Sequence, residues 1–409
     1  MGDGSGDESA VRGGQRGLSR LSRRVARTVA SIPILGRLAG GSAAGSDRAE
    51  LERRVVVPVF FNWTERAEWR EIGRGFTSLA SEGLWMSLMD RLRGVDQTRQ
   101  QFASGRRYFD CALSGALQPV LQHLGRPPDV DKAMAALAPI ASLHQSDTRD
   151  YVPAVLLCRA LTEIGWALRG PLPPDQVPPD AVKAAAPYFE RAEAAISRFD
   201  PIEENSPMIA EARYRLVPGI DGGADYLRDW YEDWADLDPS NPEVLTLHSR
   251  FLMPAWYGDL DEIEVEARRA AARAKGGLGV GAYAQFWRLP LESDPAALAH
   301  VDVRLFLAGL HAALDQSGSQ ALANEYAALL FRLSLPRSTE GRDDAARYAP
   351  IREAFAEGFS EVLRRHVQEL HPPAWGMDET AVRRVVAGDF DADYAAGAIL
   401  RVGGTGLVA

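Results

Sequence analysis

The chain has 409 residues, of which 46% are apolar and 25% are charged, values close to the average of soluble globular proteins. This composition excludes a mostly disordered chain, and no apolar run reaches the roughly 18 residues that a membrane-spanning helix needs. The two cysteines, Cys111 and Cys158, define neither a disulfide framework nor a zinc site. We therefore expect a reducing, cytoplasmic location. The shortage of lysine beside abundant arginine, alanine and glycine is typical of a GC-rich bacterial genome.

The net charge of −10 is unevenly distributed along the chain. Residues 1–54 carry ten arginines and six acidic residues, a net charge of +4, so the remaining 355 residues sum to −14. A nucleic-acid surface needs Lys and Arg clustered along one face or groove. The acidic body therefore predicts no nucleic-acid partner.

The basic leader, residues 1–54, is predicted to be mostly disordered, because 1–16 and 39–50 are rich in Gly, Ser and Ala without an apolar period. Near 17–32, however, Leu and Val recur at steps of three or four opposite a row of arginines. This pattern predicts a basic amphipathic helix that Pro33 ends or kinks. Its candidate partner or membrane contacts are Leu18, Arg20, Leu21, Arg23, Arg24, Val25 and Arg27.

Three roles are open for this helix. It could lie peripherally on an anionic membrane, dock in a protein groove, or form a basic tail that keeps the protein soluble. A secretory signal is disfavoured because arginines interrupt the apolar stretch.

From residue 55 onward the chain reads as an all-α protein. The run 55–61, V-V-V-P-V-F-F, is the one β-like segment, and its proline confines it to a sheet edge. Helices are predicted at 64–80, 84–92, 97–117, 132–143, 152–168, 181–199, 225–237, 301–315 and 319–333.

Five prolines within 170–180 predict an extended connector and a boundary there. The expected organisation is therefore an N-terminal helical region at 55–170, a Pro-rich connector at 171–180, a repeat-like helical region at 181–400 and a flexible tail at 401–409. Most helices of the second region end before Asp-Pro or a Pro-containing turn, so successive helices are expected to pack antiparallel as an α-solenoid.

The run W-A-D-L-D-P-S-N-P-E at 234–243, with G-D-L-D-E at 258–262, resembles the helix-end and inter-helix turn of a tetratricopeptide (TPR) repeat. The longer segment M-P-A-W-Y-G-D-L-D-E, 253–262, resembles a bacterial family of uncharacterised TPR-like proteins in which a P-x-W-G-G-S-like segment joins two helices. The resemblance implies an antiparallel array of helix pairs. It implies no activity.

No catalytic, cofactor-binding or metal-binding motif is present, because the histidines form no metal pair and the glycine-rich runs lack phosphate-loop spacing. One charged pattern is conspicuous in the predicted helix 225–237. Tyr226, Trp230, Trp234 and Leu237 share one face, which is expected to be core. An acidic stripe flanks that face: Asp225, Asp229, Glu232, Asp233 and Asp236.

The acidic stripe has two interpretations, a solvated surface or a groove that receives the arginine-rich helix. The sequence therefore predicts a non-enzymatic scaffold or adaptor that presents a concave helical surface to an unidentified protein partner. The alternative is a helical enzyme or small-ligand-binding protein whose site is assembled from scattered residues. A deep pocket with clustered carboxylates would favour the alternative, whereas a long groove with exposed aromatics would favour the adaptor.

Overall fold

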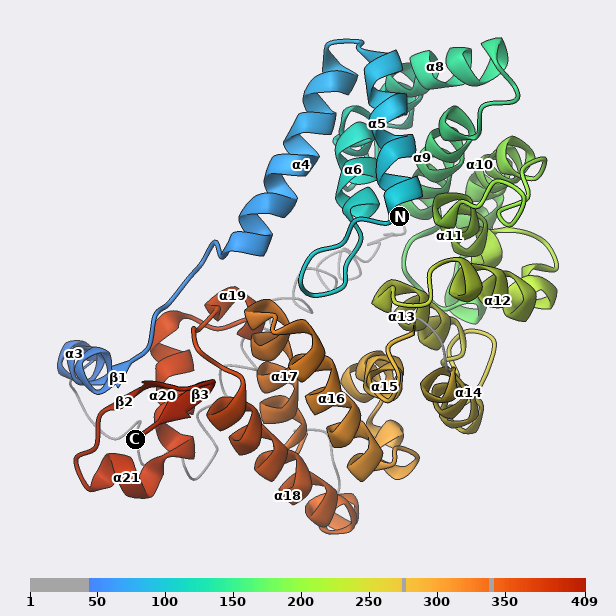
Figure 1. The fold of residues 1–409 in the computed structure, drawn as a ribbon. Helices are drawn as coiled ribbons and strands as arrows, with labels where there is room; N and C mark the ends of the chain where they lie inside the picture. The colour runs from blue at the N-terminus through green and yellow to red at the C-terminus, as the bar shows by residue number, and fades with distance from the viewer. Residues whose placement is uncertain (1–43, 274–276, 338–341) are drawn as a thin grey trace, which may run out of the picture.

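The computed structural model describes residues 44–273, 277–337 and 342–409, and the predicted all-α class is confirmed (Figure 1). The α-helices are α3 (Ala44–Arg54), α4 (Thr64–Ser81), α5 (Trp85–Thr98), α6 (Tyr108–Ala116), α7 (Gln118–Leu121), α8 (Val130–Ser146), α9 (Tyr151–Arg169), α10 (Pro179–Ile196), α11 (Pro207–Leu216), α12 (Leu227–Leu237), α13 (Pro242–Phe251), α14 (Leu260–Ala272), α15 (Gly281–Ser293), α16 (Val303–Ser317), α17 (Gln320–Leu333), α18 (Arg342–Arg365), α19 (Pro372–Trp375), α20 (Glu379–Asp389) and α21 (Asp391–Ala395). The strands are β1 (Val55–Val56), β2 (Leu400–Gly403) and β3 (Gly406–Val408).

Many helices begin at a side chain that caps the free backbone N–H groups of the first turn. Asp150 accepts from Val152 N, and Ser206, which precedes Pro207, accepts from Ile209 N. Both TPR-like segments fall at such starts: Asn241 caps α13, and Asp259 caps α14. The Pro and Asp punctuation of the sequence therefore marks the helix boundaries.

The helices follow a curved path in Figure 1, from α4–α9 through α10–α15 to α16–α18. Neighbouring helices in the chain pack on one another, as α9 does on α10, α15 on α16 and α17 on α18. Two cores result. One extends from Phe76 to Leu216 and crosses the Pro-rich connector, and the other extends from Leu51 to Leu407.

The two cores meet at α11, where Met208 and Tyr214 belong to different cores. The connector, which holds a short 3-10 helix at Pro174–Gln176, joins two helices that share one core. The expected boundary at 171–180 is therefore not a boundary between cores. Prolines there stop α9 and start α10 without separating them.

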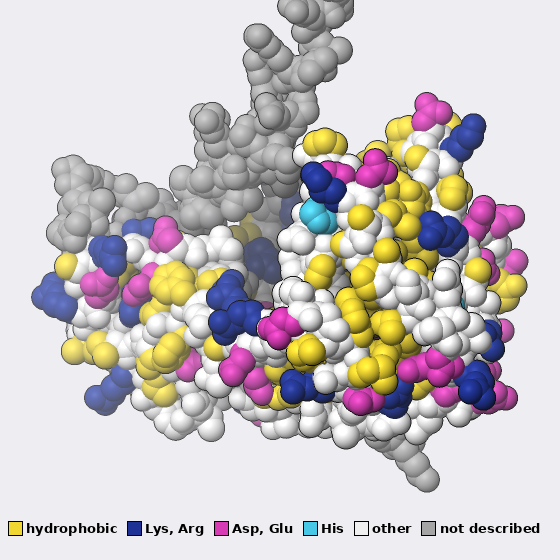
Figure 2. Space-filling model, turned by 90° about the horizontal axis from the view of Figure 1, so that it is seen from above, with side chains coloured by type: hydrophobic (Ala, Val, Ile, Leu, Met, Phe, Trp, Pro, Cys, Tyr) yellow, Lys and Arg dark blue, Asp and Glu magenta, His cyan; other side chains and the backbone are white. Residues whose placement is uncertain are grey.

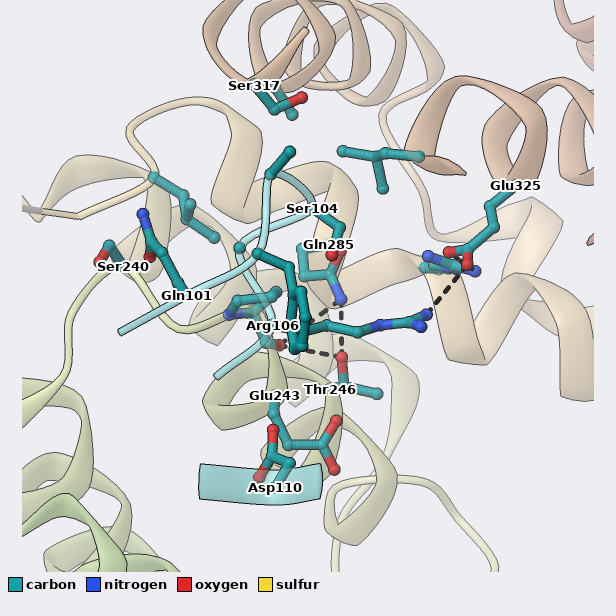
Figure 3. A pocket seen from close by; sticks show the side chains of 18 of the residues that line it. Gln101, Ser104, Arg106, Asp110, Ser240, Glu243, Thr246, Gln285, Ser317 and Glu325 are labelled. Carbon is teal, nitrogen blue, oxygen red and sulfur yellow. Dashed lines mark hydrogen bonds and ion pairs between the residues drawn. The ribbon is translucent and has the colours of Figure 1, made fainter. Parts of the chain in front are cut away.

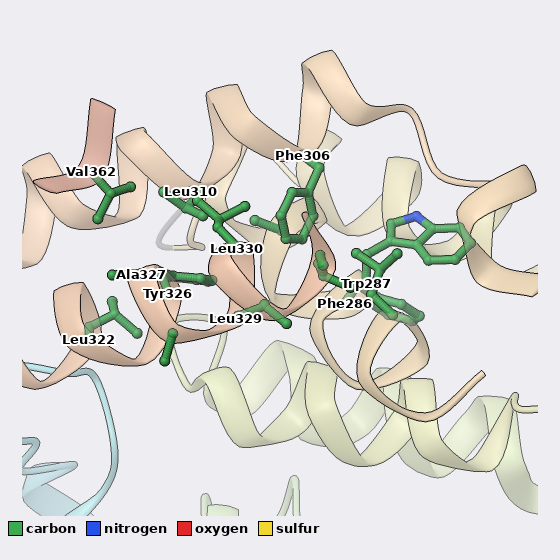
Figure 4. Packing of buried hydrophobic residues seen from close by; sticks show 14 of the residues in the cluster. Phe286, Trp287, Phe306, Leu310, Leu322, Tyr326, Ala327, Leu329, Leu330 and Val362 are labelled. Atoms are coloured by element: carbon green, nitrogen blue, oxygen red, sulfur yellow. The ribbon is translucent and has the colours of Figure 1, made fainter. Parts of the chain in front are cut away.

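In the second core, buried residues of α15, α16, α17 and α18 pack against one another (Figure 4). Trp287, Phe306, Tyr326 and Leu330 are all at most 1% exposed.

Among the described helices, α9 alone has a length and composition that would let it cross a membrane. Its apolar stretch is 72% buried inside the protein.

A small sheet joins the two ends of the described chain. β1 pairs in parallel with β2, and β2 pairs antiparallel with β3, so β1 is an edge strand, as Pro58 predicts. A further bridge links Val59 to Leu370, where Leu370 N donates to Pro58 O at 2.8 Å. Trp63 then stacks on His371, with ring centroids 4.4 Å apart. The curved path is thereby closed.

Two expectations for the chain ends are wrong. Residues 401–409 form most of a β-hairpin rather than a flexible tail, because Leu400 and Leu407 are buried at 0% and 1% exposure. The stretch 39–50, predicted to be disordered, includes the start of α3, whose Leu51 is buried in the second core. Small residues at 403–406 permit the tight turn, and Gly404 has φ +63°.

Gly406→Ala should destabilise the fold by about 1–3 kcal/mol, because a Cβ at this position would lie 2.2 Å from the backbone of Arg364 on α18. Urea unfolding measures the change. Gly94→Ala in α5 is the matched control, since a Cβ there meets nothing within 4 Å and alanine favours a helix. Equal stability of both variants would contradict the close packing of the hairpin on α18.

A histidine pair joins α16 to the residue that follows α18, with His311 Nδ1 and His366 Nε2 3.0 Å apart. The pKa of His366 is lowered to about 4, mainly by burial and also by the neighbouring His311 and Arg365. The negative charge of Asp315 partly opposes this shift. The folded protein therefore resists a proton that the unfolded chain accepts near pH 6.5.

The free energy of unfolding should consequently fall as pH drops from about 6.5 towards 4, because the unfolded state binds more protons in this window. His366→Gln should flatten that part of the stability profile in urea titrations. His123→Gln serves as the control, and a profile unaltered by the His366 change would contradict the assignment.

Candidate functional site

A pocket of about 840 Å³ occupies the inner side of the curved helical path. Its walls come from α4, α6, α9, α11, α13, α15, α16 and α17, together with the loop that precedes α6 (Figure 3). Aromatic side chains of Trp69, Phe102 and Tyr326 contribute to the lining. Residues distant in sequence therefore meet in one cavity.

The loop between α5 and α6, residues 99–107, enters the pocket, where the sequence predicted an uninterrupted helix at 97–117. Its turn is made by Gly105, with φ +86°, whose N–H donates to Phe102 O at 2.9 Å. Arg99 also has positive φ, and its side chain holds the backbone oxygens of Leu237 and Asn205. Helical periodicity through 97–117 concealed the loop because its apolar residue Phe102 is buried as well.

A buried ion pair anchors this loop. Arg107 donates to Asp238 with Nε to Oδ2 at 2.8 Å, and the two side chains are 3% and 1% exposed. Asn241 also donates to Asp238, while Arg107 donates to Ser240 and Gln101. Asp238, which follows α12 and precedes a proline, thus also binds Arg107, the residue just before α6.

One wall of the pocket carries a carboxylate held by two guanidinium groups. Glu325 on α17 accepts from Arg106 at 3.0 Å and from Arg288 on α15 at 2.8 Å. Figure 3 shows Arg106 extending from the loop across the pocket to Glu325. Burial alone would raise the pKa of Glu325, but the two arginines outweigh it and lower the pKa.

The floor of the pocket is a second charged cluster, made by Asp110 on α6, Arg159 on α9, Glu211 and Arg215 on α11, and Glu243 on α13. Glu211 is 1% exposed, and its Oε1 accepts from Arg159 at 2.9 Å and from Arg215 at 2.6 Å. Arg215 also donates to Glu243 at 3.0 Å. We call these five residues the floor cluster.

Two carboxyl groups of the floor cluster, those of Glu211 and Asp110, have pKa values shifted in opposite directions. Burial would raise the pKa of Glu211, but Arg159 and Arg215 lower it. Asp110 has the opposite shift: burial and the charges of Glu211 and Glu243 raise its pKa well above the ordinary value. Figure 3 shows Asp110 beside Glu243 at the base of the pocket. A buried carboxyl that holds its proton can donate a hydrogen bond to a bound group.

The residues selected from sequence lie elsewhere. The seven contacts predicted in the arginine-rich segment, Leu18 to Arg27, fall outside the described residues. The acidic stripe, Asp225, Asp229, Glu232, Asp233 and Asp236, lies apart from the residues that line the pocket. Two of its members have arginine partners, Glu232 with Arg228 and Asp236 with Arg273.

The aromatic face predicted for α12 is displaced. The buried residues are Leu227, Tyr231, Trp234 and Ala235. Tyr226 is 46% exposed and stacks on Trp230, with centroids 5.0 Å apart. Residue 226 belongs to a preceding 3-10 turn, Gly223–Tyr226, so it lies off the helical period.

Basic and acidic side chains are interspersed over the face of the molecule shown in Figure 2.

No signal in the sequence singled out the floor cluster. Its five members come from four helices spread over more than 130 residues, and only Glu211 and Arg215 show a local pattern, the i,i+4 spacing of a helical ion pair. Among the residues that the structure describes, no group of three or more His, Cys, Asp or Glu could hold a metal ion.

Arg107→Ala should lower the free energy of unfolding by about 3–5 kcal/mol, because it leaves the buried carboxylate of Asp238 without its cation. The loop should also become accessible, which a protease cleaving near residues 99–107 would detect. Arg228→Ala, which removes an exposed ion pair with Glu232, should leave stability nearly unchanged. Comparable small effects for both variants would contradict the anchoring role of Arg107.

The chain matches no known family model, no curated protein and no solved structure.

Proposed function

We propose that this protein binds a small polar ligand in the pocket on the inner side of its helical path. The supporting observation is a single cavity of about 840 Å³ in which two partly buried charge clusters face one space. Small-molecule sites in proteins typically have volumes of about 300–1,000 Å³ and a few convergent polar groups.

The lining supports a ligand of mixed character. Trp69, Phe102 and Tyr326 offer apolar surface, while Gln101, Ser104 and other polar groups offer hydrogen bonds. Burying charged groups costs free energy, so proteins keep such groups where pairing or function offsets the cost. Two charge clusters within one cavity therefore favour recognition over a purely structural role.

The adaptor function that the sequence predicts remains a second, less favoured proposal. It rests on the resemblance of 234–243 and 258–262 to TPR segments and on successive helices that pack on one another, as the helices of a TPR-like α-solenoid do. A protein segment would need a groove open along its length. The pocket instead gathers its charged groups from six helices and a loop around one cavity, which favours a compact ligand.

Ser114→Trp should abolish ligand binding, because this exposed residue near the end of α6 lines the pocket and an indole would fill part of the cavity. Thermal unfolding of the full chain with a panel of cationic, anionic and neutral metabolites measures binding. A ligand at about 100 times its Kd stabilises the folded state by about 2.7 kcal/mol.

Ser87→Trp is the matched control, since Ser87 is an exposed serine on α5 and lies outside the pocket. Compounds that stabilise the unaltered protein should stabilise this variant equally. A compound that stabilises Ser114→Trp as well as the unaltered chain would contradict the proposal.

A further inference from the structure

The floor cluster has one more carboxyl group than it has guanidinium groups. Glu211 and Glu243 are bound to Arg215, and Glu211 is also bound to Arg159. Within the residues that the structure describes, Asp110 makes no side-chain hydrogen bond or ion pair, although it lines the cavity. With three carboxylates and two guanidiniums ionised, the cluster would hold a net charge of −1.

Glu211 adds a second observation. Its side chain is 1% exposed and lines the cavity, and its Oε2 has no hydrogen-bond partner although Oε1 has two. Buried carboxylate oxygens are nearly always hydrogen-bonded, because removing such an oxygen from water without giving it a partner costs free energy. An acceptor of this kind in the floor of a cavity is suited to a donor group carried by a ligand.

We propose that the floor cluster binds the ammonium or guanidinium group of a small organic cation, with Asp110 as its ion partner and Glu211 Oε2 as a further acceptor. This assignment rests on the proposed function and names its ligand class. The cation supplies the charge that the cluster lacks and donates several hydrogen bonds, whereas a carboxylate ligand would meet three carboxyl groups.

The proton on Asp110 gives the proposal a distinct signature. Burial raises the pKa of Asp110 well above its ordinary value. Of the charged groups that face it, Glu211 and Glu243 raise this pKa further, whereas Arg215 and Arg159 lower it. A bound cation replaces that proton as the positive partner. Below the raised pKa, the Asp110 carboxyl therefore releases its proton to solvent as the cation binds, up to one proton per site.

The test is calorimetric titration of the full chain with n-butylammonium, n-butylguanidinium, 1-butanol and butyrate, probes with the same four-carbon chain. Each titration is run at one pH in two buffers of different ionisation enthalpy, which reports the protons released. We expect the two cations to bind at least tenfold tighter than 1-butanol and butyrate, with proton release. Asp110→Asn should weaken the cations at least tenfold and remove the proton release.

Two further variants keep the test decisive. Asp131→Asn, an exposed aspartate in the first turn of α8, should bind the cations as the unaltered chain does. Glu243→Gln tests the floor cluster should Asp110→Asn fail to fold, and it should also weaken the cations.

Butyrate or 1-butanol binding as tightly as the cations, in a manner that Ser114→Trp abolishes, would overturn the cation assignment while supporting the pocket. Cation binding unaffected by Asp110→Asn would also overturn it. Absence of binding by all four probes would count against both proposals.

Discussion

The pair Arg107–Asp238 is the interaction on which the rest of the structure depends. It joins residues 131 positions apart, and it fixes in one contact the start of α6, the end of α12 and the loop that enters the pocket. Desolvating two charges is costly, and here Asn241, Ser240 and Gln101 share the hydrogen bonding that offsets this cost. The same loop carries Arg106 to its partner Glu325, so this ion pair helps to position one wall of the pocket.

The floor cluster also depends on the Arg107–Asp238 pair, through the position of α6. Asp110 lies one turn after Arg107 on α6, so the ion pair that sets the helix start also sets the position of this carboxyl. A second buried carboxylate, that of Asp96 on α5, accepts hydrogen bonds from Tyr151, Ser206 and Met208. These bonds join α5 to α9 and to the start of α11. These contacts hold the helices that bear Arg159 and Glu211 at the distances that the cluster needs.

Local signals predicted much of the fold and none of the pocket. Apolar periodicity and Pro punctuation located α4, α9, α10, α16 and α17 within a few residues. The errors arose where tertiary contacts override local pattern: Phe102 is buried in a loop, and Leu407 is buried in a terminal hairpin of small residues. Asp110, Arg159 and Glu243 are ordinary charged residues of separate helices, and only the curvature of the chain makes them neighbours.

The pairing of β1 with β2 has a consequence for how this architecture can change. An open helical array lengthens by adding repeats at its ends or between them, because each repeat contacts only its neighbours. Here β2 must return to residues 55–56, and Leu370 must return to Pro58. Inserting a helix pair would displace those partners from each other, so the number of helices in the path is fixed by closure, and variation is confined to the loops.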